Sequence, residues 1–284
     1  MELGYAAIGH VIRRLLDEPN AMADRDRTIP TQLTDLDDLL AGGLRTGQTT
    51  VVASRPGEGS STFALGLARA AALHQRISTL LLTPDAPESE VVMRLISAET
   101  HIPLQRLRSR HLDDTEARRL QERRSHLESA PLSIQAGSPS AGTLIDTVGA
   151  MTFEEDVRLV IVDGLTSVGT DLRRAVTQMC AWAREDHYAL VFVGGVLPSQ
   201  SGADRPPTLD DLRDHDSIAD IVDTVIMIEQ AAPPEAVVHV VKHRYGPTGT
   251  IRVAHTAHTS SFSNLPTSGA ASTTATSPTH GTCR

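Results

Sequence analysis

The sequence predicts an α/β fold in which a mostly parallel β-sheet is flanked by helices and continues into antiparallel strands at its C-terminal side. From about residue 48, short β-rich runs alternate with helical stretches, the pattern of a parallel sheet covered by helices. Three later β-like runs have little helix between them, which favours antiparallel pairing. The chain has 284 residues, 40% of them hydrophobic, and can bury one sizeable core.

The two ends of the chain differ from this predicted domain, which covers residues 29–265. Residues 1–18 predict an amphipathic helix whose apolar positions follow helical spacing: Ile8, Val11, Ile12, Leu15 and Leu16. Residues 19–28 are polar and predict a flexible connection, and the Ser-, Thr- and Ala-rich residues 266–284 predict a disordered tail. The helix could pack on its own domain or on a neighbouring subunit, and both alternatives stay open.

Within the domain, the elements are predicted in a regular order. They are a strand at 49–54, a helix at 60–75, a strand at 78–83, a helix at 87–99, a strand at 158–163, a helix at 170–185 and a strand at 189–195. Three closing strands follow at 223–229, 236–243 and 250–255, and the turn-forming "RYGPTG" joins the last two.

Composition argues against several classes of function. A net charge of -9 gives no overall electrostatic reason to approach nucleic acid or an anionic membrane. No apolar run reaches the roughly 20 residues that a membrane-spanning helix needs. Cys180, Cys283 and the twelve histidines show no metal-ligand spacing, and the N-terminus lacks a secretory pattern. We therefore expect a cytoplasmic protein without a structural metal.

The stretch "SRPGEGSST" lies between the first predicted strand and helix, where a phosphate-binding loop would lie. Gly57 and Gly59 would let backbone N–H groups converge on phosphate oxygens, and the hydroxyls of Ser61 and Thr62 could reach Mg²⁺. Ser60, however, stands where such a loop has its lysine. The stretch is either a nucleotide loop without its cation or a glycine turn that never held phosphate.

A second candidate is the run "LVIVD", an apolar strand that ends in Asp163. This arrangement offers a carboxylate to the water shell of Mg²⁺. The alternative is a buried strand followed by the N-cap of a helix.

Several segments together resemble one family. They are "IPTQLTDLDDLLAGGL", "VVASRPGEGSSTFALGLA", "EVVMRLISAE", "LVIVD", "RPPTLDDLRDHDSIADIVDTVIMI" and "VKHRYGPTGTIRVAH". In this order they are similar to the C-terminal motor domain of the DnaB-type replicative helicases, over residues 29–265. The resemblance implies a RecA-like P-loop fold, ATP and Mg²⁺ as cofactors, and assembly into a homo- or hetero-oligomeric ring.

The resemblance assigns the nucleotide-binding positions. They are Ser54, Arg55, Gly57, Gly59, Ser60, Ser61, Thr62 and Asp163, with Ser61 and Asp163 as the Mg²⁺ ligands. The family has lysine at position 60 and often an apolar residue at position 58, where this chain has Glu58. A lost cation removes charge-assisted hydrogen bonds, and an added carboxylate repels phosphate, so both changes weaken ATP binding.

The resemblance also assigns catalytic positions, with further departures. Asp85 aligns with the glutamate that activates the attacking water, one methylene shorter, and Gly195 aligns with the glutamine that senses the γ-phosphate. Lys242 and Arg244 match two basic residues that reach the active site of a neighbouring subunit in trans. The alternative for these two is a tight hairpin with solvated basic flanks.

Support for DNA binding is thin. The loop "LPSQSGADRPP" offers one arginine, Arg205, and aromatic residues make up only 3% of the chain, whereas single-strand binding relies on a basic track with stacking groups. Single-stranded DNA is still the substrate that the resemblance implies.

Three functions follow from these patterns. The first is an active ATP-dependent DNA helicase. The second is a ring subunit with little or no ATP turnover that acts as a scaffold or regulator, either alone or in a mixed ring with an active DnaB-type helicase. The third is another ATPase-like protein of the RecA superfamily. Departures at Ser60, Asp85 and Gly195, combined with retained Lys242 and Arg244, favour the second.

Overall fold

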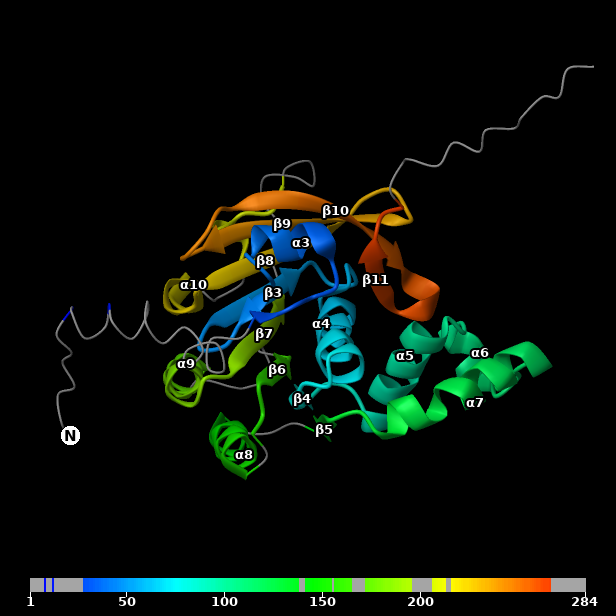
Figure 1. Cartoon of the computed structure of the whole chain (residues 1–284). Helices are drawn as coiled ribbons and strands as arrows, with labels where there is room; N and C mark the ends of the chain where they lie inside the picture. Colours follow the sequence, from blue (N-terminus) through cyan, green and yellow to red (C-terminus); the bar gives the residue numbers. More distant parts are fainter. Residues whose placement is uncertain are drawn as a thin grey trace, which may run out of the picture.

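The central element of the fold is a nine-stranded β-sheet. The computed structural model describes Ile8, Ile12 and residues 28–137, 141–154, 156–164, 172–195, 206–212 and 216–266. In these residues the strand order is β11-β10-β9-β8-β3-β7-β6-β4-β5, beside a two-stranded ribbon of β1 and β2 (Figure 1). The strands are β1 (Thr28–Ile29), β2 (Leu44–Arg45), β3 (Thr49–Ser54), β4 (Thr79–Thr83), β5 (Leu132–Ala136), β6 (Leu159–Asp163), β7 (Ala189–Gly195), β8 (Thr224–Gln230), β9 (Glu235–His243), β10 (Gly249–Thr256) and β11 (Ser261–Asn264).

The sheet has a parallel and an antiparallel part, as predicted. Strands β8, β3, β7, β6, β4 and β5 pair in parallel, and β8, β9, β10 and β11 pair antiparallel. The predicted α/β fold class is therefore confirmed. Strands β5 and β11, one at each edge, were not predicted by the sequence pattern.

Helices cover both faces of the sheet. They are α3 (Thr34–Leu39), α4 (Ser60–Arg69), α5 (Glu88–Thr100), α6 (Leu104–Ser109), α7 (Asp114–Glu128), α8 (Ala141–Glu154), α9 (Leu172–Asp186) and α10 (Asp216–Ile221). A short π-helical turn, Ala70–His74, continues α4. The predicted helices at 60–75, 87–99 and 170–185 match α4 with this turn, α5 and α9, whereas α6, α7 and α8 were not predicted.

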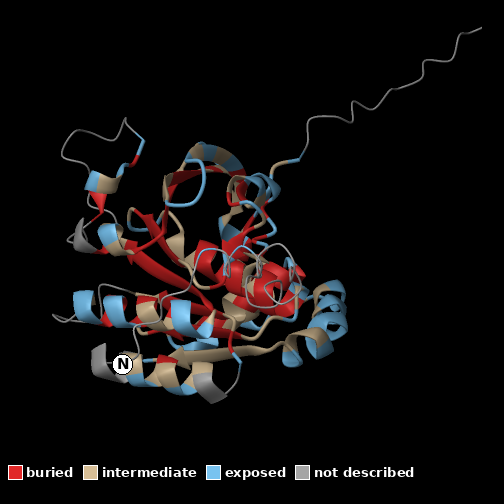
Figure 2. Cartoon of the chain, turned by 60° about the vertical axis from the view of Figure 1, so that its left-hand side comes forward, coloured by how far each residue is buried: buried red, intermediate tan, exposed pale blue. Residues whose placement is uncertain are grey.

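Two hydrophobic clusters form the core, one on each face of the sheet. Because side chains alternate along a strand, Val52 of β3 joins the cluster under α4, and Val51 and Ala53 join the cluster under α9. Figure 2 shows buried residues along the central strands and exposed residues on the outer sides of the helices. Burial on both faces explains why these strands read as continuous apolar runs.

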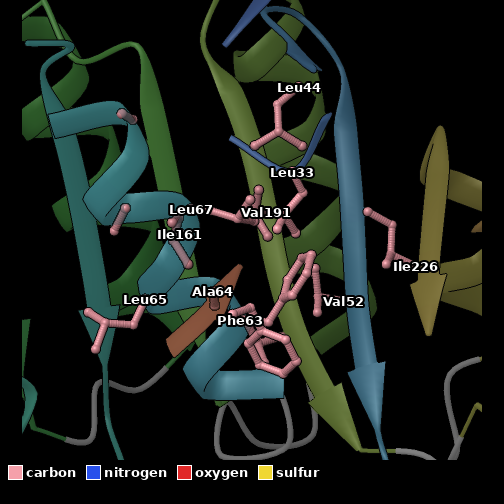
Figure 3. Packing of buried hydrophobic residues seen from close by; sticks show 14 of the residues in the cluster. Leu33, Leu44, Val52, Phe63, Ala64, Leu65, Leu67, Ile161, Val191 and Ile226 are labelled. Carbon is pink, nitrogen blue, oxygen red and sulfur yellow. The ribbon is translucent and has the colours of Figure 1, made fainter. Parts of the chain in front are cut away.

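Helix α4 connects the core to the loop before it. Its Phe63 is 2% exposed and packs toward Val52 and Val191 between the helix and the sheet (Figure 3). The first residue of α4, Ser60, follows directly on the glycine-containing loop. The core thus fixes the position of the loop.

The predicted end segments fall largely outside the described residues. Of the N-terminal helix, only Ile8 and Ile12 are described; both are helical, and they are 78% and 46% exposed. The predicted connection, the disordered tail and the domain boundaries therefore stay predictions. In the part of the chain that is described, no helix is both long and apolar enough to cross a membrane.

Candidate nucleotide-binding site

The loop from Ser54 to Ser60 joins β3 to α4 at the carboxyl edge of the parallel strands. Gly57 and Gly59 have φ angles of +85° and +104°, a region that favours glycine. A Cβ on Gly59 would lie 3.1 Å from the ring of Phe262, whereas one on Gly57 would meet no atom within 4 Å. The loop therefore needs glycine at both positions for its backbone, and its Gly57 side faces open space.

Ser54 and Ser60 close the base of the loop. The hydroxyl of Ser54 donates to the carbonyl of Arg55 at 3.0 Å and accepts the backbone N–H of Ser60 at 3.2 Å. Ser60 and Thr62 are half-buried in the first turn of α4. The side chain at position 60 is thus a short neutral hydroxyl where the resemblance places a lysine ammonium.

Glu58 folds back over its own loop. Its Oε2 accepts the backbone N–H of Arg55 at 3.2 Å, and its Oε1 accepts from Nη1 of Arg55 at 3.5 Å. The same Nη1 lies 3.9 Å from Oε1 of Glu229 on β8. The Glu58 carboxylate therefore binds the Arg55 N–H and lies next to the Arg55 guanidinium.

The two residues that the resemblance assigns to Mg²⁺ lie together. The Ser61 hydroxyl donates to Oδ1 of Asp163 at 2.9 Å, so the two predicted Mg²⁺ ligands meet. The Asp85 carboxylate lies against Gly164, since a Cβ on that glycine would be 2.8 Å from Oδ2 of Asp85. Two acidic groups and one hydroxyl therefore converge from β6, α4 and the loop that follows β4.

Charges around this edge shift the acidity of Asp163. Burial raises the pKa of its carboxyl above the usual range, the Ser61 hydrogen bond opposes this, and the nearby Asp85 charge raises the pKa further. Arg94 of α5 lies close enough to lower the pKa, while its Nε donates to Glu90 at 2.9 Å. A divalent cation would relieve the unfavourable charge, because carboxylate and hydroxyl oxygens suit Mg²⁺.

The residues of the site thus fit Mg²⁺ and the nucleotide phosphates unequally. The hydroxyl and carboxylates at the Asp163 edge suit Mg²⁺ together with nucleotide phosphates. At the phosphate edge, the residue at position 60 carries no charge, and Glu58 competes for the donors. The residues present therefore fit Mg²⁺ better than they fit the terminal phosphates of a nucleotide.

A polar and aromatic cluster of Gln230, His255 and Phe262 packs against the loop. No sequence motif indicated this cluster. Nε2 of Gln230 donates to the Glu58 carbonyl at 2.7 Å and to Nδ1 of His255 at 2.8 Å, when that ring nitrogen is unprotonated. The His255 ring stacks on Phe262 with centroids 4.4 Å apart. Burial lowers the pKa of His255, which favours the neutral imidazole ring.

Gly195 lies beside the loop, at the end of β7. It is the register partner of Ser54 on β3, and a Cβ built on it would meet nothing within 4 Å. The position is thus open to a side chain, and glycine offers none. Arg205, the predicted DNA contact, lies outside the described residues.

Lys242 and Arg244 lie near the start of β8, at the end of the parallel strands that is opposite the loop. Nζ of Lys242 donates to the carbonyls of Ala219 and Val222 at 2.5 and 2.8 Å, and burial lowers its pKa. Nη1 of Arg244 donates to Oδ1 of Asp223 at 3.0 Å. Both side chains bind their own chain at this corner, and the structure does not bring them to the loop of the same chain.

Comparisons with known proteins place these features in a family. The family described as the DnaB-like helicase C-terminal domain matches residues 28–264. The replicative DNA helicase DnaB of Leifsonia xyli is 30% identical, with 92% of this chain and 62% of that protein covered. The DnaB of Mycobacterium intracellulare is 31% identical, with 72% and 39% covered. The chain spans about 37% to 62% of the length of such curated relatives.

Solved structures show the same fold. One of them, an isolated ATPase domain, superposes with a TM-score of 0.78 at 19% identity, covering 93% of this chain and all of that one. A DnaB-like replicative helicase, described with its interactions with primase, also gives 0.78 at 19% identity and is covered over 68% of its length. On the family match across most of its length, the chain belongs to the DnaB-like helicase C-terminal domain family.

Proposed function

We propose that this chain is a ring subunit of the DnaB type whose own nucleotide site has little or no turnover, and that it acts as a scaffold or regulator. The observation that carries this proposal is the difference between the two edges of the site. The Ser61–Asp163 edge is assembled, yet the phosphate edge has a serine at position 60 and a glutamate folded over the loop. A nucleotide would lose the charge-assisted contacts that grip its terminal phosphates.

The residues at the two catalytic positions, Asp85 and Gly195, are also expected to lower ATP turnover. Asp85 lies beside Asp163 but is one methylene shorter than glutamate, and general base catalysis requires reach to the attacking water. Gly195 lies beside the loop without a side chain that could report on a phosphate. Weak binding and weak chemistry thus come from separate positions.

Lys242 and Arg244 are proposed to serve a neighbouring subunit. The side chain of Arg244 is 45% exposed and donates to Asp223 through Nη1. The exposed part of its guanidinium could meet a phosphate across an interface. Lys242 would fix the corner that presents it, through carbonyls in α10 and just after it. The neighbour could be a second copy of this chain or an active DnaB-type helicase, with single-stranded DNA as the substrate of the ring.

A groove on the outer face offers a place for the N-terminal helix of a neighbour. It has a volume of about 610 Å³, lies between α5, α7 and the edge strand β5, and is lined by apolar side chains that include Val92, Leu95, Ile96, Leu120, Leu127 and Leu132. Glu88, Arg124 and Glu128 also line it. Arg124 donates to Glu128 at 2.7 Å, so Glu88 is the acidic lining residue that is opposite in charge to Arg13 and Arg14. The exposed Ile8 and Ile12 would fill the groove.

Nucleotide binding provides the test of the proposed function. Mg²⁺-ATP is titrated into the wild-type chain and into a Ser60→Lys, Glu58→Met variant, with the binding heat as readout. We expect tight binding in the variant alone, because each charge-assisted hydrogen bond that is restored contributes roughly 1.5–3 kcal/mol. Micromolar binding and DNA-stimulated hydrolysis by the wild-type chain would contradict the proposal. They would instead support an active helicase, which the family match over residues 28–264 favours.

Assembly is tested separately. Ile8→Glu and Ile12→Glu, or Val92→Glu in the groove, should weaken self-association about ten- to hundredfold, since burying one such side chain contributes roughly 1.5–3 kcal/mol. His10→Glu, which adds the same charge off the apolar positions, is the control. Sedimentation equilibrium gives the association constants. If the three test variants associate as strongly as the His10→Glu control, this docking is ruled out.

A further inference from the structure

The loop carries one cation, and an acidic side chain holds it. In the sequence from Ser54 to Thr62 the charged residues are Arg55 and Glu58. Nη1 of Arg55 lies 3.5 Å from Glu58 and 3.9 Å from Glu229. The three side chains are 18% to 24% exposed, so the cluster is folded onto the protein yet within reach of solvent.

We propose that Arg55 is the residue that binds the terminal phosphates of a nucleotide in this chain. The Glu58 carboxylate occupies the phosphate position beside Arg55 until a phosphate displaces the carboxylate. The proposal deepens the nucleotide site proposed above and rests on it. It assigns Arg55 to binding and gives it no part in hydrolysis.

Glu58 has the contacts of a bound anion. One of its oxygens accepts the backbone N–H of Arg55 at 3.2 Å and the other faces the guanidinium. Loop N–H groups and a guanidinium are the donors that hold phosphate oxygens in nucleotide-binding loops. A carboxylate oxygen uses the same donors, so Glu58 and a phosphate compete for one position.

The long contacts of Arg55 favour displacement of Glu58 by phosphate. A strong charge-assisted N–H···O contact spans about 2.7–2.9 Å, and both contacts of the Arg55 guanidinium are longer. A polyphosphate carries more charge and more oxygens than one carboxylate. It can therefore displace Glu58, at the cost of a lower affinity than an open loop would have.

The Glu58 side chain can leave without unfolding the loop. The backbone at this residue is held independently, because its carbonyl accepts from Gln230 at 2.7 Å. The base of the loop is closed by Ser54 and Ser60. Open space lies next to Gly57, so the carboxylate has room to move.

Glu58 is also the better residue to change. The other acidic partner, Glu229, accepts from Nε2 of the buried His239 at 3.2 Å when that nitrogen carries hydrogen. Changing Glu229 would disturb β9 as well as Arg55. Glu58→Gln removes one charge, keeps the shape of the side chain and leaves the backbone contact to Gln230 in place.

A double-mutant cycle tests the proposal. Wild-type chain, Glu58→Gln, Arg55→Ala and the double variant are titrated with Mg²⁺-ATP and with inorganic pyrophosphate, and dissociation constants are measured calorimetrically. We expect Glu58→Gln to bind both ligands about tenfold more tightly, because the carboxylate that competes for the Arg55 guanidinium is removed. We expect Arg55→Ala to bind more weakly than wild type and to abolish the gain in the double variant.

The control is Asp156→Asn. Asp156 is an exposed acid whose Oδ1 lies 3.3 Å from Nε of Arg158, ahead of β6 and away from the loop. It has a positive φ that asparagine tolerates, and its change removes the same charge. Binding should not change, and thermal midpoints should show that all variants are folded.

Two results would overturn the inference. An equal gain from Glu58→Gln with and without Arg55 would mean that the glutamate acts by its charge alone and that Arg55 does not hold phosphate. No gain, or no measurable binding in any variant, would mean that Glu58 does not occupy a phosphate position. If the wild-type chain hydrolyses ATP rapidly but the cycle shows coupling, the proposed function fails and this inference stands.

Discussion

Replacing Asp223 with alanine should lower the free energy of unfolding by roughly 3–5 kcal/mol. The carboxylate is 1% exposed and accepts both the backbone N–H and the hydroxyl of Thr49, at 3.0 and 3.1 Å, and Nη1 of Arg244. Its removal leaves the Thr49 N–H buried without this partner, which costs about 1–3 kcal/mol, and loses a hydrogen bond to a charged group worth about 1.5–3 kcal/mol. Urea-induced unfolding measures the change.

Asp223→Asn separates the two contributions. The amide oxygen can still accept from Thr49, so the loss should be smaller than for alanine. Arg244→Ala, which removes an exposed partner and leaves Thr49 satisfied, should change stability least. If Asp223→Ala stays within about 0.5 kcal/mol of wild type, as an ordinary surface change does, then Asp223 does not anchor the start of β3.

The same carboxylate connects stability to the proposed function. Thr49 is the first residue of β3, which leads to the nucleotide loop, and Arg244 is the proposed contact to a neighbour. One buried side chain therefore fixes the strand that positions the loop and the arginine at the opposite end of the parallel strands. The sequence stretch "DIVDTVIMI" predicts a strand here, but nothing in it indicates that Asp223 pairs with a residue 174 positions earlier.

The sheet was predictable where burial leaves a simple pattern. Strands β3, β6, β7 and β8 are buried along most of their length and read as apolar runs. Strand β5 was missed because each of its residues is only half-buried and polar residues interrupt it. Helix α7 was missed because it is strongly polar and has no buried residue, although its Asp113–Glu116 capping box marks its start.

The candidate site was predictable only where a motif carries it. Ser61 and Asp163 were paired through the family resemblance, and the structure brings them together. Gln230 and His255 lie far from the loop in sequence, on β8 and β10, and only the folded sheet brings them to Glu58. Arg94 belongs to helix α5. The sequence pattern of this helix predicts which of its side chains are buried, but it does not predict that Arg94 lies near the Asp163 carboxylate on β6.

Replacing Phe63 with alanine should cost about 3–5 kcal/mol, the range for a large aromatic side chain removed from a packed core. Phe63 is 2% exposed and meets Phe262 edge to face, with ring centroids 5.4 Å apart. Phe262 in turn packs on His255 and against Gly59 of the loop. The cavity would therefore remove support from the loop as well as from the core, and thermal unfolding followed by circular dichroism measures the loss.

A double-mutant cycle with Phe262→Ala tests whether this support is direct. Edge-to-face aromatic pairs contribute about 0.5–1.5 kcal/mol beyond their buried area, so the double variant should lose less than the sum of the single losses by about that amount. Leu65→Ala on the same helix, buried in the same core cluster but not lining the cavity that Phe63 shares with Phe262, is the matched control and should add independently with Phe262→Ala. Additive losses for Phe63 and Phe262 would contradict the packing described here, and the loop would then depend on its polar contacts to Gln230 and Ser54 alone.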